Sequence, residues 1–251
     1  MAALSIQYWR NCRVRDPKNS MAKNLIISGG IYHPFDETSA ALAALMAPLG
    51  VQSTITEDIE GALQSLDDYD LVTLNCIRWR MIQNDKYIPF RDEWAMELSE
   101  TGRQSLHDHV HKGGGLLGMH TASICFDTWP EWKDLLGVMW HWNRSFHPEI
   151  ADINVEIADG AHPIVKGLQG FELFDEIYHH LAPADDAPGL LFAKADEGRQ
   201  PLMWARDVGK GRVVYDSLGH DASSIAHPTH ARILQRSVLW ALGRDAEIGA
   251  I

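Results

Sequence analysis

Four short apolar runs, each followed by a segment with helix signals, fill the first half of the chain. The runs cover residues 23–28, 51–56, 70–76 and 116–120, and the predicted helices cover roughly 36–48, 59–66 and 92–112, with a fourth that begins near Thr121. Apolar strands that alternate with helices are typical of a parallel sheet covered by helices on both faces. The alternation therefore predicts an α/β fold with a mainly parallel sheet.

The second half of the chain has a different pattern. Residues 151–158 alternate as an edge strand does, residues 201–206 and 212–217 flank a glycine-containing loop that predicts a hairpin, and residues 230–242 are typical of a closing helix. No internal repeat, low-complexity tract or long linker separates the two halves. We therefore expect a single domain over residues 1–251.

The net charge limits the partners that we expect, and the cysteine content limits the expected cellular location. The net charge of −12 disfavours phosphate backbones and anionic lipid, so we expect neither nucleic acid nor a membrane as partner. No apolar run approaches the roughly 20 residues that span a bilayer, and residues 1–17 lack the apolar block of a signal peptide. Cys12, Cys76 and Cys125 form no disulfide framework, so we expect a cytoplasmic protein.

Three histidines follow three different predicted strands. His33, His120 and His220 come after the first apolar run, after the fourth and after the second strand of the hairpin. Ligands of open parallel sheets bind beyond the carboxyl ends of the strands, so we expect these imidazoles around one cleft. Residues 118–122 have the strand–turn–helix pattern of a nucleophile elbow with His120 at the apex, which suits proton transfer or metal binding; a helix cap is the alternative.

Carboxylates accompany these histidines. Asp221 adjoins His220 and is expected to orient an imidazole, the alternative being a solvent-facing polar turn. Asp175 or Glu176 is expected to supply the carboxylate of an acid/base pair, and an exposed strand edge is the equal alternative.

Two segments, residues 77–91 and 129–148, are rich in Trp and Arg, lack a regular period and are expected as inserted loops over a site. Trp142 and His147 lie in the second segment, where aromatic rings are expected to stack on a sugar; contacts within a homo-oligomer or packing in the core are the alternatives. Gly29 and Gly30 lack the spacing of nucleotide-binding loops, so no nucleotide cofactor is expected.

Other histidines receive structural interpretations. His162 is expected to cap a short helix, and the cluster of His107, His109 and His111 is interpreted as helix surface, because His107 and His111 share one face and His109 points elsewhere.

Five motifs together resemble the ThuA family of trehalose utilisation proteins. They are ISGGIYH at residues 27–33, GGGLLGMH at 113–120, HPIVKGL at 162–168, DEIY at 175–178 and GKGRVVYDSLGHD at 209–221. The resemblance spans roughly residues 23–244 and implies a flavodoxin-like three-layer α/β/α sandwich, similar to class I glutamine amidotransferases. It also implies that glutaminase activity is absent, because His120 stands where those enzymes carry a cysteine, and Cys125 is five residues further on.

The resemblance further implies a role beside sugar oxidoreductases that make 3-keto-glycosides, so the expected substrate is a small-molecule glycoside or its keto derivative. We expect acid/base elimination or hydrolysis of the glycosidic bond. The expected catalytic residues are His120, His220, Glu176 and Asp221, and the expected substrate-binding residues are His33, His147, Tyr178 and Trp142. A divalent metal such as zinc, held by His33, His120 and His220, stays open, as do two other functions: a non-catalytic sugar-binding or partner protein, and a metal-dependent glycoside hydrolase.

Overall fold

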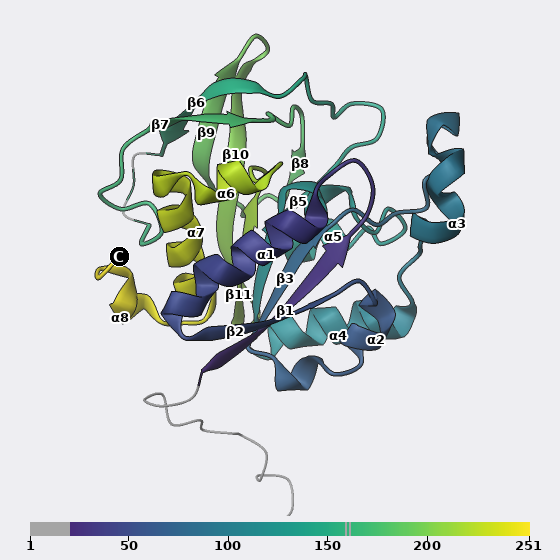
Figure 1. Ribbon diagram of the computed structural model, residues 1–251, viewed down its shortest axis with the longest axis horizontal. Coiled ribbons are helices and arrows are strands. Elements are labelled where there is room, and N and C mark those ends of the chain that lie inside the picture. The colour runs from purple at the N-terminus through teal and green to yellow at the C-terminus, as the bar shows by residue number, and fades with distance from the viewer. Residues whose placement is uncertain (1–20, 159, 161) are drawn as a thin grey trace, which may run out of the picture.

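A nine-stranded sheet forms the centre of the molecule. The computed structural model describes residues 21–158, 160 and 162–251; Cys12 and the expectation about a signal peptide lie outside these residues. The strand order is β2-β1-β3-β4-β11-β10-β9-β6-β7 (Figure 1). A second, two-stranded sheet pairs β5 (Val138–Met139) with β8 (Ala182–Pro183).

The large sheet has a parallel half and an antiparallel half. The parallel half consists of β2 (Val51–Thr56), β1 (Ala22–Gly29), β3 (Leu71–Cys76), β4 (Gly115–Met119) and β11 (Gly211–Asp216). The antiparallel half adds β10 (Gly198–Val208), β9 (Gly189–Ala195), β6 (Ala151–Ile157) and β7 (Phe171–Asp175). The prediction of a mainly parallel sheet therefore holds only for the five strands from β2 to β11 in the sheet order, because the β10–β11 hairpin reverses the strand direction.

Helices cover both faces of the sheet. One face carries α1 (Phe35–Met46), α6 (Ala222–Ala226) and α7 (Pro228–Ala241), and the other carries α2 (Ile59–Leu63), α4 (Glu100–His111) and α5 (Trp132–Leu136). Successive residues of a strand point to opposite faces. Ile26 accordingly packs in the core beneath α1 and α7, whereas its neighbour Ile27 packs in the core beneath α2 and α4.

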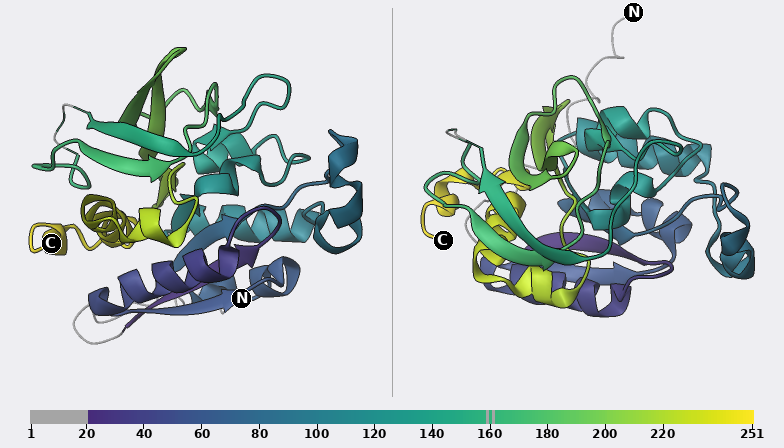
Figure 2. Two further views of the ribbon diagram at one scale, coloured as in Figure 1. Left: turned by 45° about the horizontal axis from the view of Figure 1, so that its top comes forward. Right: turned by 90° about the horizontal axis from the view of Figure 1, so that it is seen from above.

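The expected helix over residues 92–112 is in fact two helices. The first is α3 (Arg91–Trp94), and Ala95 after it is extended with ψ 134°. Ser99 then starts α4, because its hydroxyl accepts a hydrogen bond from the amide of Gly102 at 3.0 Å. The 3-10 helix η3 (Asp85–Phe90) and α3 lie together at one end of the molecule, away from the sheet (Figures 1 and 2).

Three other predicted elements also differ. Residues 151–157 form an inner strand between β9 and β7, so β7 and not this segment occupies the edge. The predicted helix near Thr121 is the short 3-10 helix η4 (His120–Ile124), and the second predicted helix ends at Leu63, before the 3-10 turn η2 (Leu66–Asp68). The short 3-10 helix η1 (Ala47–Leu49) follows α1, and α8 (Asp245–Ile248) ends the chain.

The segment 129–148 is only partly a loop. Trp129 and Trp132 at its start are buried in the core beneath α4 and α5, at 5% and 0% exposure. The part after β5 is irregular and contains the more exposed Trp142 and His147. Among the described residues, no helix is long and apolar enough to cross a membrane.

Candidate functional site

Side chains that follow four different strands meet at the carboxyl edge of the parallel half. His33 follows β1, His120 follows β4, His220 follows β11, and Glu176 follows β7. One nitrogen or oxygen atom from each of these residues lies within 4.8 Å of the others. The structure therefore brings together the three strand-end histidines that the sequence singled out, and adds a carboxylate from the opposite edge of the sheet.

His120 sits at a strained turn between β4 and η4. Its φ of 41° lies in the left-handed region, which non-glycine residues adopt only when their surroundings hold them there. Two hydrogen bonds do so: its Nδ1 is 2.6 Å from the carbonyl oxygen of Ser217, and its own carbonyl accepts from the hydroxyl of Tyr215 at 2.7 Å. A carbonyl oxygen only accepts, so Nδ1 carries the proton and Nε2 faces the site.

The turn after β1 delivers His33 to the same point. Gly30 has a φ of 143°, and a Cβ there would lie 2.8 Å from the carbonyl oxygen of Ile77, so only glycine allows this close approach. The Nδ1 atom of His33 lies 3.2 Å from the carbonyl oxygen of Ile31, and its Nε2 lies 3.1 Å from Nε2 of His120. Both imidazoles thus turn the same nitrogen toward each other.

Glu176 lies at the centre of the cluster. Its Oε2 is 3.4 Å from Nε2 of His120, and its Oε1 is 3.3 Å from Nδ1 of His220 and 3.4 Å from Nδ1 of His147. Glu176 and His120 are buried, with 8% and 2% of their side chains exposed, whereas 43% of the His147 side chain is exposed. Of these three side chains, only that of His147 is exposed to solvent.

Asp175 fixes the backbone on both sides of the site. Its carboxylate accepts hydrogen bonds from the amides of Glu176 at 2.7 Å, Gly219 at 2.8 Å and His220 at 3.3 Å, and from the hydroxyl of Ser224. The sequence alone left Asp175 and Glu176 as equal candidates for one carboxylate. The structure separates them: Glu176 faces the imidazoles, and Asp175 holds the loop that carries His220.

Burial and neighbouring charges shift the pKa values of the site residues in different directions. Burial, together with neighbouring His120, lowers the pKa of His33 to about 3. Burial alone would raise the pKa of Glu176, but His120 and His220 outweigh it and hold that pKa well below its usual range. The adjacent Glu176 carboxylate raises the pKa of His220, and burial raises that of Tyr178. Glu176 is therefore a carboxylate at neutral pH.

Tyr178 and Trp142 belong to a group of aromatic side chains beside the histidine cluster. The hydroxyl of Tyr178 lies 3.0 Å from Nε2 of His120. Trp142 stacks on Trp79 with ring centroids 5.8 Å apart, and Trp140 packs edge-on against Tyr178 at 5.3 Å. Tyr178 thus touches the cluster directly, whereas Trp142 contacts other aromatic rings beside it.

Asp221 lies beside the cluster but points elsewhere. Its Oδ1 accepts hydrogen bonds from the amides of Ser223 at 2.8 Å and Ser224 at 3.0 Å, so it is the N-cap of α6. The carboxylate that faces the ring of His220 is that of Glu176. The geometry thus gives Asp221 a capping position instead of the expected contact with an imidazole.

The remaining histidines lie away from the site. His107 and His111 stack on the surface of α4 with ring centroids 3.8 Å apart, but His109 is buried and its Nε2 lies 3.2 Å from the carbonyl oxygen of Gly115. The prediction of helix surface is therefore wrong for His109. His162 accepts from the amide of Ile164 at 3.4 Å within a turn, and no helix follows it.

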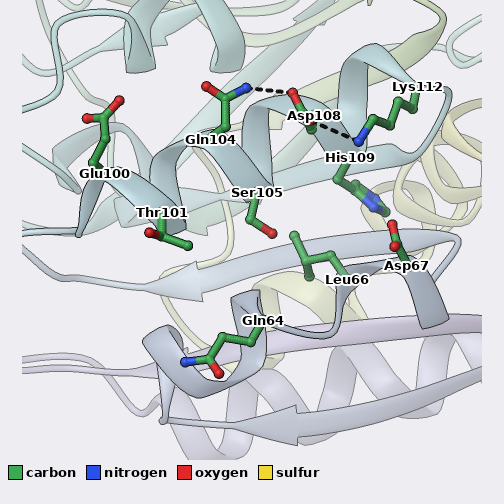
Figure 3. A pocket seen from close by; sticks show the side chains of 10 residues that line it. All are labelled: Gln64, Leu66, Asp67, Glu100, Thr101, Gln104, Ser105, Asp108, His109 and Lys112. Atoms are coloured by element: carbon green, nitrogen blue, oxygen red, sulfur yellow. Dashed lines mark hydrogen bonds and ion pairs between the residues drawn. The ribbon is translucent and has the colours of Figure 1, made fainter.

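A groove between α2 and α4 contains none of these cluster residues (Figure 3). Three of its polar side chains pair with one another: Asp108 accepts from Gln104 at 2.6 Å and lies 2.9 Å from Nζ of Lys112.

Comparison with known proteins agrees with this architecture. A family model described as ThuA, trehalose utilisation, matches residues 23–241. Among solved structures, a ThuA-like protein from Parabacteroides merdae has a TM-score of 0.67 and 21% identity, over 88% of this chain and 90% of that one. A ThuA-like protein from Bacteroides uniformis has a TM-score of 0.67 and 17% identity, over 91% and 94%.

A more distant structure, cytoplasmic protein STM3548 from Salmonella typhimurium, has a TM-score of 0.57 and 15% identity, over 88% of this chain and 98% of that one. These identities show a shared fold only. A search of curated proteins gave no match. Because the family model covers most of the chain, this protein belongs to the ThuA family.

Proposed function

We propose that this chain acts on a 3-keto-glycoside and cleaves its glycosidic bond by acid/base elimination or by hydrolysis, without glutaminase activity. The observation that carries the proposal is the convergence of His33, His120, His220 and Glu176 at one strand edge. Groups that move protons near neutral pH have to lie within hydrogen-bonding reach of one another and of the substrate. The distances of 3.1–3.4 Å among these side chains meet that requirement.

The chemistry of a keto sugar fits such a site. The C2 proton of a 3-keto-glycoside is acidic because its loss gives an enolate with the charge on the ketone oxygen. When the C2–H bond breaks, a C1–C2 double bond forms and the C1–O bond breaks, so the leaving sugar takes a proton from an acid. The reaction therefore needs a base, a group that stabilises the enolate oxygen, and an acid.

The cluster offers candidates for each part. Glu176 and His220 form the carboxylate–imidazole pair that takes up and returns the proton, and His120 with the Tyr178 hydroxyl faces the ketone oxygen. We assign the binding of sugar hydroxyls to His33 and to the exposed His147, which packs against Trp140, the aromatic neighbour of Trp142. Asp221 contributes by capping α6 behind His220.

The proposal also includes the fold, the number of domains and the cellular location. A flavodoxin-like three-layer sandwich, similar to class I glutamine amidotransferases, is supported by the order β2-β1-β3-β4-β11 and by helices on both faces. A single domain is supported by continuous hydrophobic cores on both faces of the sheet, and a cytoplasmic location is supported by the free thiols of Cys76 and Cys125 and by the description of the Salmonella protein as cytoplasmic.

The test is incubation with matched pairs of oxidised and unoxidised disaccharides, beginning with 3-keto-trehalose and trehalose, followed by measurement of released sugar. We expect release from the keto substrate only, and a loss of about 10²–10⁴-fold in rate for His120→Ala and for His220→Ala. His111→Ala on α4 is the matched control and should keep the wild-type rate. Unchanged rates in both site variants would overturn the assignment, and binding without turnover would favour a sugar-binding protein.

A further inference from the structure

Two nitrogen lone pairs face each other inside the cluster. The Nδ1 atoms of His33 and His120 both lie against backbone carbonyl oxygens, those of Ile31 and Ser217, so both carry their protons there. In the neutral rings, the two Nε2 atoms are then unprotonated, yet they lie only 3.1 Å apart. Such a contact is repulsive unless a cation or a proton lies between the two nitrogens.

Two more groups of the cluster lack hydrogen-bond partners among the described residues. They are Oε2 of Glu176, which lies 3.4 Å from the unprotonated Nε2 of His120, and Nδ1 of His220. The Tyr178 hydroxyl can give one proton to His120, but it leaves the lone pair of His33 and the Glu176 oxygen without a donor. Buried polar atoms without partners are rare in folded proteins, and here they face one point.

The spacing of these atoms fits a metal ion. Zinc binds nitrogen and oxygen ligands at about 2.0–2.1 Å in a tetrahedral arrangement, which puts neighbouring ligand atoms roughly 3.3–3.4 Å apart. The corresponding distances here are 3.1 Å between the Nε2 atoms of His33 and His120, 3.4 Å between Nε2 of His120 and Oε2 of Glu176, and 3.3 Å between Oε1 of Glu176 and Nδ1 of His220. These three contacts are close to the ligand spacing of a zinc site, and one ligand atom from each of the four residues lies within 4.8 Å of the others.

The geometry points to a divalent transition-metal site, of the kind that binds zinc, formed by His33, His120, His220 and Glu176. Three imidazoles and one carboxylate favour borderline metals over magnesium or calcium, which prefer oxygen ligands. The contacts behind the ligands fit as well, because metal-binding histidines usually donate their other N–H to a carbonyl, as His33 and His120 do.

The metal site deepens the proposed function and rests on it only for the role of the metal in the reaction. A bound metal supplies a Lewis acid for the ketone oxygen of the substrate. When the metal is bound, Glu176 and His220 act as its ligands, so the proton transfer proposed for them in the metal-free site passes to His147 and Tyr178, which lie outside the four ligands. Metal binding itself does not depend on what the substrate is.

Zinc binding by the full-length chain is the direct test. Protein treated with a chelator and dialysed is titrated with zinc alone by calorimetry, and with cobalt to record the absorption bands of a tetrahedral site. We expect one tight site per chain and a raised melting temperature. Magnesium at the same concentration should change neither.

Matched variants separate this site from a surface site. His107 and His111 stack on α4 at i and i+4 and can bind zinc on their own. The double variant His107→Ala/His111→Ala should keep the tight site. Glu176→Gln and His33→Ala should weaken zinc binding by more than about 100-fold, the upper end of the loss for removing an outer-shell partner. Circular dichroism and the metal-free melting temperature check that these two variants fold.

The outcomes distinguish the site from the proposed function. Tight zinc binding that persists in both cluster variants, or is lost only in the α4 variant, would overturn the metal site. Absence of tight zinc binding, together with unchanged release of sugar from 3-keto-trehalose by chelated protein, would also overturn the metal site and leave the proposed function intact. Tight cluster-dependent zinc binding without turnover of any keto-glycoside would support the site and reject the function.

Discussion

Two groups of imidazoles and carboxylates adjoin the loop that follows β11: the pair of Asp216 and His230, and the cluster that contains His220 and Glu176. They differ in how many of their polar atoms have hydrogen-bond partners. The ring of His230 lies between Asp216, 3.1 Å from Nε2, and the carbonyl oxygen of Ser224, 2.8 Å from Nδ1, and both members of the pair are fully buried. In the cluster of His33, His120, His220 and Glu176, by contrast, unprotonated nitrogens face each other, and Glu176 Oε2 has no hydrogen-bond partner in the part of the chain that the structure describes.

The difference teaches how to distinguish a structural pair from a functional site. Each nitrogen of the His230 ring has an acceptor, and Asp216 also accepts from the amide of Leu218, so the group has no need of a ligand. In the cluster at the strand edge, by contrast, Oε2 of Glu176 and Nδ1 of His220 lack hydrogen-bond partners among the described residues. A buried network that is only partly satisfied is costly, and it is retained where a ligand completes it.

The largest effect that tests this comparison is expected in the cluster. Glu176→Gln keeps the shape of the side chain but removes the charge that faces three imidazoles. We expect turnover of a keto-glycoside to fall by about 10²–10⁴-fold, with little change in the free energy of unfolding. Steady-state rates and urea unfolding measure both quantities. The control is Glu172→Gln, which changes an exposed residue on β7. A loss of stability in Glu176→Gln as large as that expected for His230→Gln would contradict the distinction between the cluster and the structural pair.

The next largest effect is expected at the structural pair. His230→Gln removes one partner of a buried ion pair and should lower the free energy of unfolding by about 3–5 kcal/mol. Activity per folded molecule should change much less than in the Glu176 variant. Urea unfolding of His230→Gln, Asp216→Asn and the double variant gives the coupling between the two residues. Additive losses would show that the pair does not act as a unit.

The pH dependence of stability sharpens the same contrast. Burial alone would lower the pKa of His230, but the Asp216 carboxylate raises it above its ordinary value of 6.5. A raised folded-state pKa contributes stability that is fully present below pH 6.5 and is lost as the pH rises through the folded-state pKa. The stability difference between wild type and His230→Gln should therefore shrink from pH 6 toward alkaline pH. A difference that grows with pH would contradict this protonation state.

The smallest effect is expected at Asp221. Asp221→Ala removes the N-cap of α6 and should cost about 1 kcal/mol of stability. Because Asp221 caps a helix and Glu176 is the carboxylate against His220, turnover should stay within a few-fold of wild type. Asp221→Asn, which keeps an acceptor oxygen, should recover most of the stability. A loss of turnover in Asp221→Asn comparable with that of Glu176→Gln would assign Asp221 to the reaction after all.

The placement of the three strand-end histidines could be predicted because it depends on local patterns. His33 and His120 directly follow apolar runs that the parallel pairing of β1, β3 and β4 aligns at one edge. The glycines at 29 and 30 and the short turn at His120 are visible in the sequence, so the region of the site follows from strand direction alone.

The parts that could not be predicted depend on contacts between distant segments. Glu176 was expected as a catalytic residue, but its route into the site was not: it enters from β7, at the far edge of the antiparallel half, and a periodic pattern carries no information on which strands pair across the sheet. The roles of Asp175 and Asp221 were likewise hidden, because each adjoins a site residue in sequence and only its hydrogen bonds show where its carboxylate points.

The sequence by itself determined the α/β class, the strand directions in the first half of the chain, and the three imidazoles that follow β1, β4 and β11, because local periodicity indicates which segments are buried strands. Only the tertiary structure decided that half of the sheet is antiparallel and that Glu176 completes the cluster. It also decided which nitrogen of His33 and His120 faces the site, because that choice is made by the carbonyl oxygens of Ile31 and Ser217, the second of which lies 97 residues from its histidine.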